Sequence, residues 1–272
     1  MNKILSASRW DVGQLAANSM KAAAAFWFVA AVAGQWMFAW YMVALYGGSA
    51  VLGNWAPWEK HGFNAADSVG SAAIVIHLLF AAVLTIGGPL QLIPQLRRHA
   101  PRLHRWNGRV FLTAAAISAI AGLFMVWMRG TVGSFLSHLA ISLDAVLILL
   151  CGAMALRHAL SRQFAPHRRW ALRLFLVVNG VWFFRVGLMF WLIVNHGPAG
   201  FDPKTLQGPF IDVLSFAESL LPLVVLELYL RARDGGSTAE RWAVTALLLV
   251  VTVAMCVGIF GATMGMWLPR IR

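Results

Sequence analysis

Long apolar segments alternate with short polar connectors along the whole of this 272-residue chain. Each apolar segment is long enough to cross roughly 30 Å of hydrocarbon as an α-helix, which takes about 20 residues. The pattern predicts an all-α, polytopic membrane protein with about seven transmembrane helices in a single membrane domain over residues 1–272. The expected spans are 24–46, 71–93, 109–128, 135–156, 171–194, 211–230 and 243–268.

The composition supports the same class. Hydrophobic residues make up 60% of the chain and charged residues only 12%, a balance that a soluble core does not accommodate. The first apolar run is too long for a signal-peptide core and has no clear cleavage site, so we expect it to remain as a signal anchor. Cys151 and Cys256 both fall inside expected spans, which argues against a disulfide framework.

The net charge of +12 follows the topology and does not indicate a nucleic-acid partner. Arginine and lysine concentrate in every second connection, and the positive-inside rule makes these connections cytoplasmic. We therefore expect a multi-pass protein of a bacterial inner membrane, with a cytoplasmic N-terminus and a periplasmic C-terminus. The expected cytoplasmic basic residues are Lys3, Arg9, Lys21, Arg97, Arg98, Arg102, Arg105, Arg109, Arg157, Arg162, Arg168, Arg169, Arg173, Arg231, Arg233 and Arg241. The other connections hold Lys60, Arg129, Lys204, Arg270 and Arg272.

Histidine-containing motifs repeat in the middle of the chain. His77 is followed 27 residues later by HRW at His104, and His138 is followed 29 residues later by HRRW at His167. Both units begin on the expected outer side and turn on the cytoplasmic side. Residues 71–194 are therefore predicted to form a duplicated four-helix bundle made of two parallel helix-hairpin repeats. The flanking helices are 24–46 and two C-terminal helices within 211–268.

These histidines form two expected pairs, one near each face of the membrane. His77 and His138 lie about two turns inside the outer surface, while His104 and His167 begin spans at the cytoplasmic surface. Two imidazoles on opposed helices can supply both axial ligands of a haem iron. The arrangement predicts two b-type haems. The substitute ligands at the inner site are His99 and His158.

Helical phase adds three residues to the haem hypothesis. Gly122 and Arg185 each come eighteen residues after a histidine of the inner pair, and eighteen residues return to the same face of a helix. Gly88 lies near the face of His77, where a glycine allows a flat ligand to approach the backbone. Arg185 is expected beside the outer haem as the partner of a propionate.

Other interpretations of the ionisable residues remain open. Asp144, Arg185 and Glu218 are costly in lipid and could line a transport path, because carriers also contain parallel repeats. Arg185 could instead form a structural ion pair with Glu218 or Asp144. His77 and His138 could bind a divalent metal together with a carboxylate in a membrane enzyme, or act as interhelical hydrogen-bond partners. The inner histidines also fit an ordinary interfacial belt of Arg, Trp and His.

Two related strings carry a family resemblance, HRWNGRVFL from His104 and HRRWALRLF from His167. Together with the upstream His77 and the span that carries Glu218, they resemble an uncharacterised bacterial family of predicted membrane proteins, domain of unknown function 2306. The resemblance covers roughly residues 70–230, and the family name implies no activity.

A more distant likeness, in four-helix arrangement and His pairing, is to the dihaem cytochrome b561 group. That likeness implies electron transfer across the membrane between two haems. It also implies an oxidoreductase of the quinol- or metal-reductase kind, if the protein is an enzyme. The partner would be a membrane quinone or a separate redox protein, because the sequence has no nucleotide, flavin, zinc-protease, serine-hydrolase or thiol-redox motif.

Overall fold

The computed structural model describes residues 2–60, 63–129 and 133–271. These residues contain no β-strand, only an isolated antiparallel bridge between Asp202 and Gln207. The helices are α1 (Asn2–Met42), α2 (Gly48–Val51), α3 (Ala56–Glu59), α4 (Ser68–Leu92), α5 (Pro94–His99), α6 (Pro101–Phe124), α7 (Phe135–Leu160), α8 (Phe164–Val178), α9 (Gly180–Val194), α10 (Pro209–Gly235), α11 (Thr238–Ala262) and α12 (Leu268–Ile271). Three π-helical turns are η1 (Val43–Gly47), η2 (Met125–Arg129) and η3 (Thr263–Trp267).

Among the described residues, six helices are long and apolar enough to cross a membrane. The bent pair α8 and α9 makes a seventh if it is counted as one span. The prediction of an all-α polytopic membrane protein is therefore confirmed. All six spans extend beyond at least one end of their expected ranges. The longest are the first, which runs over Val12–Val51 through α1, η1 and α2, and the last, which runs over Thr238–Ile271 through α11, η3 and α12.

The expected span 171–194 departs most from a straight helix. It divides into α8 and α9, which meet at Asn179 with a bend of 54°. Asn179 has φ −93° and ψ 13°, and its side-chain amide donates to the Phe175 carbonyl at 2.7 Å. Asparagine and glycine are poor helix formers, so the Asn179-Gly180 step favours a break here. Hydropathy does not reveal the break because both halves of the span are apolar.

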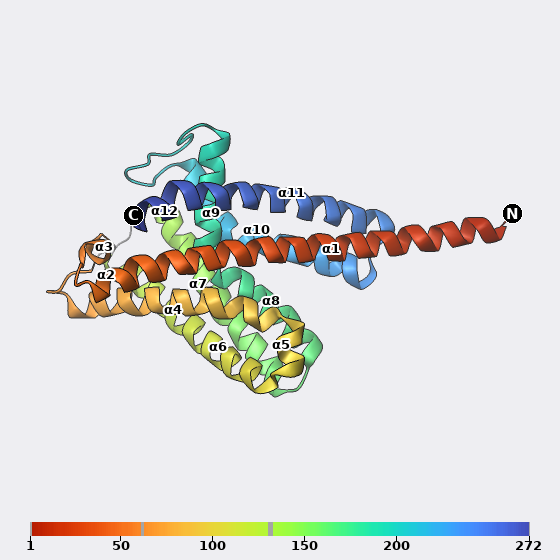
Figure 1. Cartoon of the computed structure of the whole chain (residues 1–272), viewed down its shortest axis with the longest axis horizontal. Helices are drawn as coiled ribbons and strands as arrows, with labels where there is room; N and C mark the ends of the chain where they lie inside the picture. Colours follow the sequence, from red (N-terminus) through yellow and green to blue (C-terminus); the bar gives the residue numbers. More distant parts are fainter. Residues whose placement is uncertain (1, 61–62, 130–132, 272) are drawn as a thin grey trace.

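The helices pack in two connected groups. Helices α4, α6, α7 and α8 pack on one another in that order, and α4 also contacts α8. Figure 1 shows α6 and α8 of this group lying obliquely to a second group, in which α1 and α11 run side by side, while α4 packs along α1. Helix α9 packs on α11, and α10 contacts α7, α8, α9 and α11. The break at Asn179 therefore lies where the two groups join.

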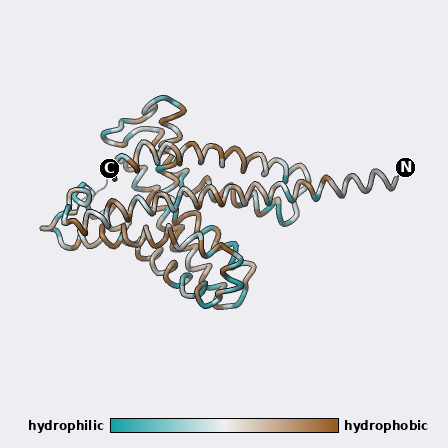
Figure 2. The backbone as a smooth tube through the Cα atoms, viewed as in Figure 1, coloured by the Kyte–Doolittle hydropathy of each residue, from teal (hydrophilic) through white to brown (hydrophobic). Residues whose placement is uncertain are grey.

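Arginine gathers at one end of the helices. The α4–α6 and α7–α8 connections, which include Arg98 and Arg162, and the α10–α11 connection, which follows Arg233 in the last turn of α10, define what we call the Arg-rich end. The Arg-poor end contains the α6–α7 and α9–α10 connections. Figure 2 shows hydrophilic connections joining long apolar helices. On the helix surfaces, Val250 and Phe260 are 66% and 62% exposed, as expected for side chains that face lipid.

Candidate functional site

Gly180, at the start of α9, lies against two carboxylates. A Cβ atom at this position would lie 3.2 Å from Asp144 Oδ2 and 3.4 Å from Glu218 Oε1. Asp144 belongs to α7 and Glu218 to α10, so three helices meet here. Glu218 is 7% exposed. Asp144 and Glu218 therefore form an internal carboxylate pair beside the helix break.

Ser219 and α9 provide the polar surroundings of the carboxylate pair. Ser219 Oγ donates a hydrogen bond to Asp144 Oδ1. Because α9 begins at Gly180, the positive end of its helix dipole points toward the two acids. Neither carboxylate forms an ion pair with any residue that the structure describes. The pair is thus surrounded by the Ser219 hydroxyl and the start of α9, without a directly paired cation among the described residues.

Glu218 also lies on the wall of a cavity that extends toward the Arg-poor end. This cavity has a volume of about 190 Å³ and is lined by Gly133 and Leu206 in the Arg-poor connections. Ser137 and Ser215 line it nearer to Glu218. Ser215 and Glu218 are three residues apart on α10 and so share a helix face. A partly polar route connects the Arg-poor end with Glu218.

Hydroxyl groups and one carboxylate form a connected set beside this cavity, which Ser137 and Ser215 line. Ser134 Oγ donates to Asp212 Oδ1, and Ser137 Oγ donates to the same oxygen at 3.4 Å. Ser215 Oγ donates to the Ile211 carbonyl at 2.8 Å and lies 3.4 Å from Ser137 Oγ. These groups can both donate and accept hydrogen bonds, as a proton path requires.

A second, larger cavity reaches Glu218 from the other side. It has a volume of about 830 Å³ and is lined by Lys21 and Arg233 at the Arg-rich end. Glu218 lines it part of the way along, and Trp191 and Phe210 line it toward the Arg-poor end. Glu218 therefore lines both cavities, and only the larger one reaches the Arg-rich end.

Arg185 lies close to the carboxylate pair but is not bonded to it. Its Nη1 donates to the Val181 carbonyl at 3.1 Å, and its guanidinium carbon lies 5.2 Å from the centre of the Phe38 ring. No ion pair joins Arg185 to Asp144 or Glu218 in the part of the chain that the structure describes, so the ion-pair alternative is wrong.

The helical phase of His167 does not extend to Arg185. The expectation requires one continuous helix between the two residues, whereas the helix breaks and bends by 54° at Asn179. Arg185 nevertheless lies close enough to His77 for its charge to act on that ring. Because of this bend, the phase counted from His167 does not determine which way Arg185 faces. Its role beside a haem propionate stays a prediction.

The structure places His77 against α6 and His138 against η2. His77 faces the backbone of Ser118, and the Nδ1 atom of His77 is buried with no hydrogen-bond partner among the described residues. The His138 ring lies edge-on to Trp127, with ring centres 6.3 Å apart. These contacts do not establish that the two histidines face each other. The outer haem site stays a prediction.

The inner pair is brought closer together. His104 at the start of α6 and His167 at the start of α8 lie within electrostatic range of each other. His167 Nδ1 is 2.9 Å from the Ala155 carbonyl oxygen, which leaves its Nε2 atom free of that bond. His104 Nδ1 is buried and has no hydrogen-bond partner in the described structure. Metal-bound histidines commonly donate their other ring N–H to a carbonyl in this way.

The substitute ligands have local partners. His99 Nδ1 lies 2.9 Å from the Gln95 carbonyl oxygen, and His158 Nδ1 lies 2.8 Å from Gln163 Oε1. Both residues belong to the connections at the Arg-rich end. These bonds are consistent with roles in the turns.

The two predicted glycines differ in their surroundings. A Cβ atom at Gly88 would lie 3.0 Å from Phe111 and 3.2 Å from Phe175, so two aromatic rings occupy the space that the glycine leaves. At Gly122 such an atom would meet nothing within 4 Å. Close approach of a flat ligand is therefore compatible with Gly122, whereas Gly88 serves the packing of α4 against α6 and α8.

The structure does not support the metal-enzyme alternative. No group of three or more His, Cys, Asp or Glu side chains that could hold a metal ion occurs among the described residues. A site made from His77, His138 and a carboxylate is therefore not formed. Cys151 is buried and Cys256 is exposed, and both are free thiols within helices.

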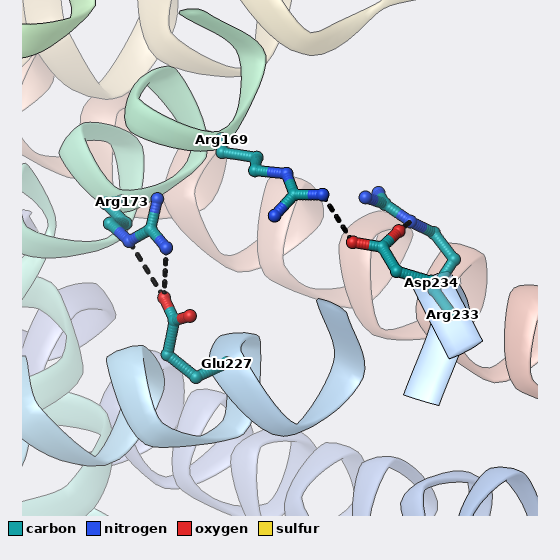
Figure 3. A network of polar contacts seen from close by, with 5 residues as sticks. All are labelled: Arg169, Arg173, Glu227, Arg233 and Asp234. Atoms are coloured by element: carbon teal, nitrogen blue, oxygen red, sulfur yellow. Dashed lines mark hydrogen bonds and ion pairs between the residues drawn. The ribbon is translucent and has the colours of Figure 1, made fainter. Parts of the chain in front are cut away.

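An ion-pair network between α8 and α10 was not anticipated from the sequence. Figure 3 shows Arg173 bound to Glu227 through Nε and Nη2, at 2.8 and 2.7 Å from the same carboxylate oxygen. Arg169 and Arg233 both bind Asp234 nearer the Arg-rich end. The sequence did offer a signal for the pair of Arg173 and Glu227, because both residues fall inside expected spans and a charge there needs a partner.

Comparison with known proteins identifies one family. Residues 74–205 match the family model described as "Predicted membrane protein (DUF2306)", which confirms the family resemblance of the sequence. The matched stretch includes Asp144, Gly180 and Arg185, and it ends before α10. No curated protein matches the chain. No solved structure matches it either.

Proposed function

We propose that this protein, whose residues 74–205 match the DUF2306 family model, is a transporter that carries protons across the membrane through Glu218 and Asp144. The observation that supports this function is that Glu218 lines both cavities. A group that must take a proton from one side and release it to the other needs access to both. Intramembrane acids with such access are characteristic of proton relays in pumps and transporters.

The spacing of the two acids supports proton exchange between them. Both acids lie against Gly180. Two ionised carboxylates beside the same residue repel each other strongly in an apolar interior. One shared proton removes that repulsion. Ser219, which donates to Asp144, can follow the change of charge by rotating its hydroxyl.

The broken span provides a place for movement. Discontinuous helices in transporters present their ends to substrates and coupling ions near the middle of the membrane. Here the break at Asn179 faces the carboxylate pair, so a change in the angle between α8 and α9 alters the surroundings of both acids. Proton binding and helix movement are coupled in this proposal.

Proton flux into liposomes tests the function directly. The purified full-length protein is reconstituted into liposomes that contain the pH indicator pyranine, with potassium and valinomycin present to prevent a membrane potential. After a step in external pH, we expect the internal pH to change faster than in protein-free liposomes. Equal rates in the two preparations would exclude the proton-transport function.

A second function, transmembrane electron transfer, has support at the inner histidine pair. His104 and His167 lie within electrostatic range, and the bond from His167 Nδ1 to Ala155 leaves Nε2 available as a ligand. These two residues would hold a b-type haem at the Arg-rich end, and a second haem would need His77 and His138. A bound haem would supply one-electron transfer.

An absorption spectrum distinguishes the electron-transfer function from the proton path. If haem is bound, the purified protein shows a Soret band and an α band that sharpens on reduction with dithionite. His104→Ala and His167→Ala then each remove the same haem, whereas His99→Ala and His158→Ala leave it in place. A colourless protein purified from haem-supplemented cells rules out this second function.

A further inference from the structure

The larger cavity has the form of a site for a long apolar chain. It runs between α1 and α11 on one side and α8, α9 and α10 on the other. Its volume of about 830 Å³ lies within the range of roughly 300–1,000 Å³ that is usual for small-molecule sites. Aromatic and aliphatic side chains form most of its wall, including Phe28, Phe183, Trp191 and Met255. Such a wall favours a hydrocarbon chain by burying its surface.

The charges at the Arg-rich end of this cavity are unbalanced. Lys21 from α1 and Arg233 from α10 both line the cavity. Asp234 is the carboxylate bound by Arg233, and it also binds Arg169. Two cations therefore share one carboxylate, and Lys21 adds a third positive charge on the cavity wall. No ion pair to Lys21 is found among the described side chains, so its ammonium group is available to a ligand.

We infer that the larger cavity binds a single-chain anionic amphiphile, with its acidic head beside Lys21 and Arg233 and its chain along the apolar wall. The cations complement a carboxylate or phosphate head, and the cavity extends from them past Glu218 toward Trp191. The inference that the amphiphile binds rests only on the cavity and its lining residues. The role of this amphiphile as the solute that moves with the proton rests on the proposed function.

Position along the cavity gives the two parts of the site different tasks. Lys21 and Arg233 recognise the head, whereas Glu218 lies part of the way along the chain and does not contribute to anion binding. An ionised Glu218 would disfavour an apolar neighbour, and a protonated one would accept it. The amphiphile therefore enters most readily when Glu218 holds a proton, which links solute and proton in a single site.

A fluorescent fatty-acid analogue tests the binding site. The full-length protein in nanodiscs of zwitterionic phosphatidylcholine is titrated with 11-(dansylamino)undecanoate, and dansyl fluorescence is compared with that of empty nanodiscs. We expect saturable enhancement that palmitate reverses and hexadecanol does not. If hexadecanol competes as well as palmitate, or if no saturable signal appears, the inference is wrong.

Paired variants locate the head group. Lys21→Gln combined with Arg233→Gln should weaken binding about tenfold, the result of losing roughly 1.4 kcal/mol of charge attraction. The matched control combines Arg102→Gln with Arg105→Gln, two exposed arginines of the Arg-rich end that do not line the cavity. Equal weakening by both double variants would show that surface charge alone attracts the probe, and would overturn the assignment.

A second pair of variants locates the chain. Ala254→Phe places a ring inside the cavity and should weaken binding at least tenfold. Val250→Phe adds the same kind of ring to the same helix at a position that is 66% exposed, and it should bind as the wild type does. Circular dichroism and gel filtration of all variants exclude misfolding as the cause. Unchanged binding by Ala254→Phe would place the probe elsewhere.

One further variant separates this inference from the proposed function. Glu218→Gln should still bind the probe, because the head-group cations are unchanged, but it should lose proton flux. Probe binding without proton flux in the wild type would contradict the transport function alone. Proton flux without saturable binding would contradict the amphiphile site alone.

Discussion

Replacing Glu218 with glutamine is expected to reduce proton flux to the rate of protein-free liposomes. Glutamine keeps the size and hydrogen-bonding capacity of the side chain but cannot exchange a proton. Because Glu218 lines both cavities, its loss interrupts the path at the point where the two sides meet. The measurement is the pyranine response after a pH step.

The companion variant Asp144→Asn should have a smaller effect. Asp144 lies against Gly180 beside Glu218 but is not among the residues that line either cavity. We expect flux to fall about tenfold, which corresponds to roughly 1.4 kcal/mol on the barrier, because Glu218 still exchanges protons without a partner. Glu59→Gln, an exposed acid at the Arg-poor end, serves as the control and should match the wild type. Flux that persists in Glu218→Gln would contradict the path.

The sequence determined the helical class and most of the spans because hydropathy is a local property. An apolar run long enough to cross the membrane must satisfy its backbone hydrogen bonds within itself, so it forms a helix wherever it lies. Hydropathy did not predict the helix break at Asn179. A single Asn-Gly step hardly changes the hydropathy of a window, although it changes the direction of everything that follows.

Depth could be inferred from the sequence, but helix packing could not. Asp144, Arg185 and Glu218 were recognised as costly intramembrane residues, and their proximity near the helix break agrees with that. Which of them touch depends on how α7, α9 and α10 pack, and a hydropathy pattern does not specify that packing. Arg185 was one alternative partner of Glu218, whereas the structure brings Glu218 beside Asp144.

The histidine repeat shows the same limit. Equal spacing places His104 and His167 at equivalent depths, and the structure has them within electrostatic range. The same reasoning gave His77 and His138 equivalent depths, but their described contacts are with Ser118 and with Trp127. A repeat in sequence constrains the level of a residue in the membrane and leaves its direction to the packing of neighbouring helices.

The ion pair between Arg173 and Glu227 is expected to make a large contribution to stability. The Arg173 side chain is 20% exposed and the Glu227 side chain is 40% exposed, and both residues lie within membrane-spanning helices. Arg173→Leu leaves the Glu227 carboxylate without its partner, and Glu227→Leu does the same to the guanidinium. Each single variant should lower the free energy of unfolding by about 2–3 kcal/mol, the approximate cost of an unpaired charge in a membrane helix.

The double variant decides whether charge pairing is the cause. Combining Arg173→Leu with Glu227→Leu removes both charges, so most of the lost stability should return, as measured by denaturant unfolding in one detergent. Arg169→Leu is the matched control, because its pair with Asp234 has side chains 47% and 37% exposed and should change stability by less than about 1 kcal/mol. If the double variant is as unstable as the less stable of the two single variants, Arg173 stabilises the protein by another interaction. Its contact with the Trp170 ring, 4.8 Å from the guanidinium carbon, would then be the interaction to test.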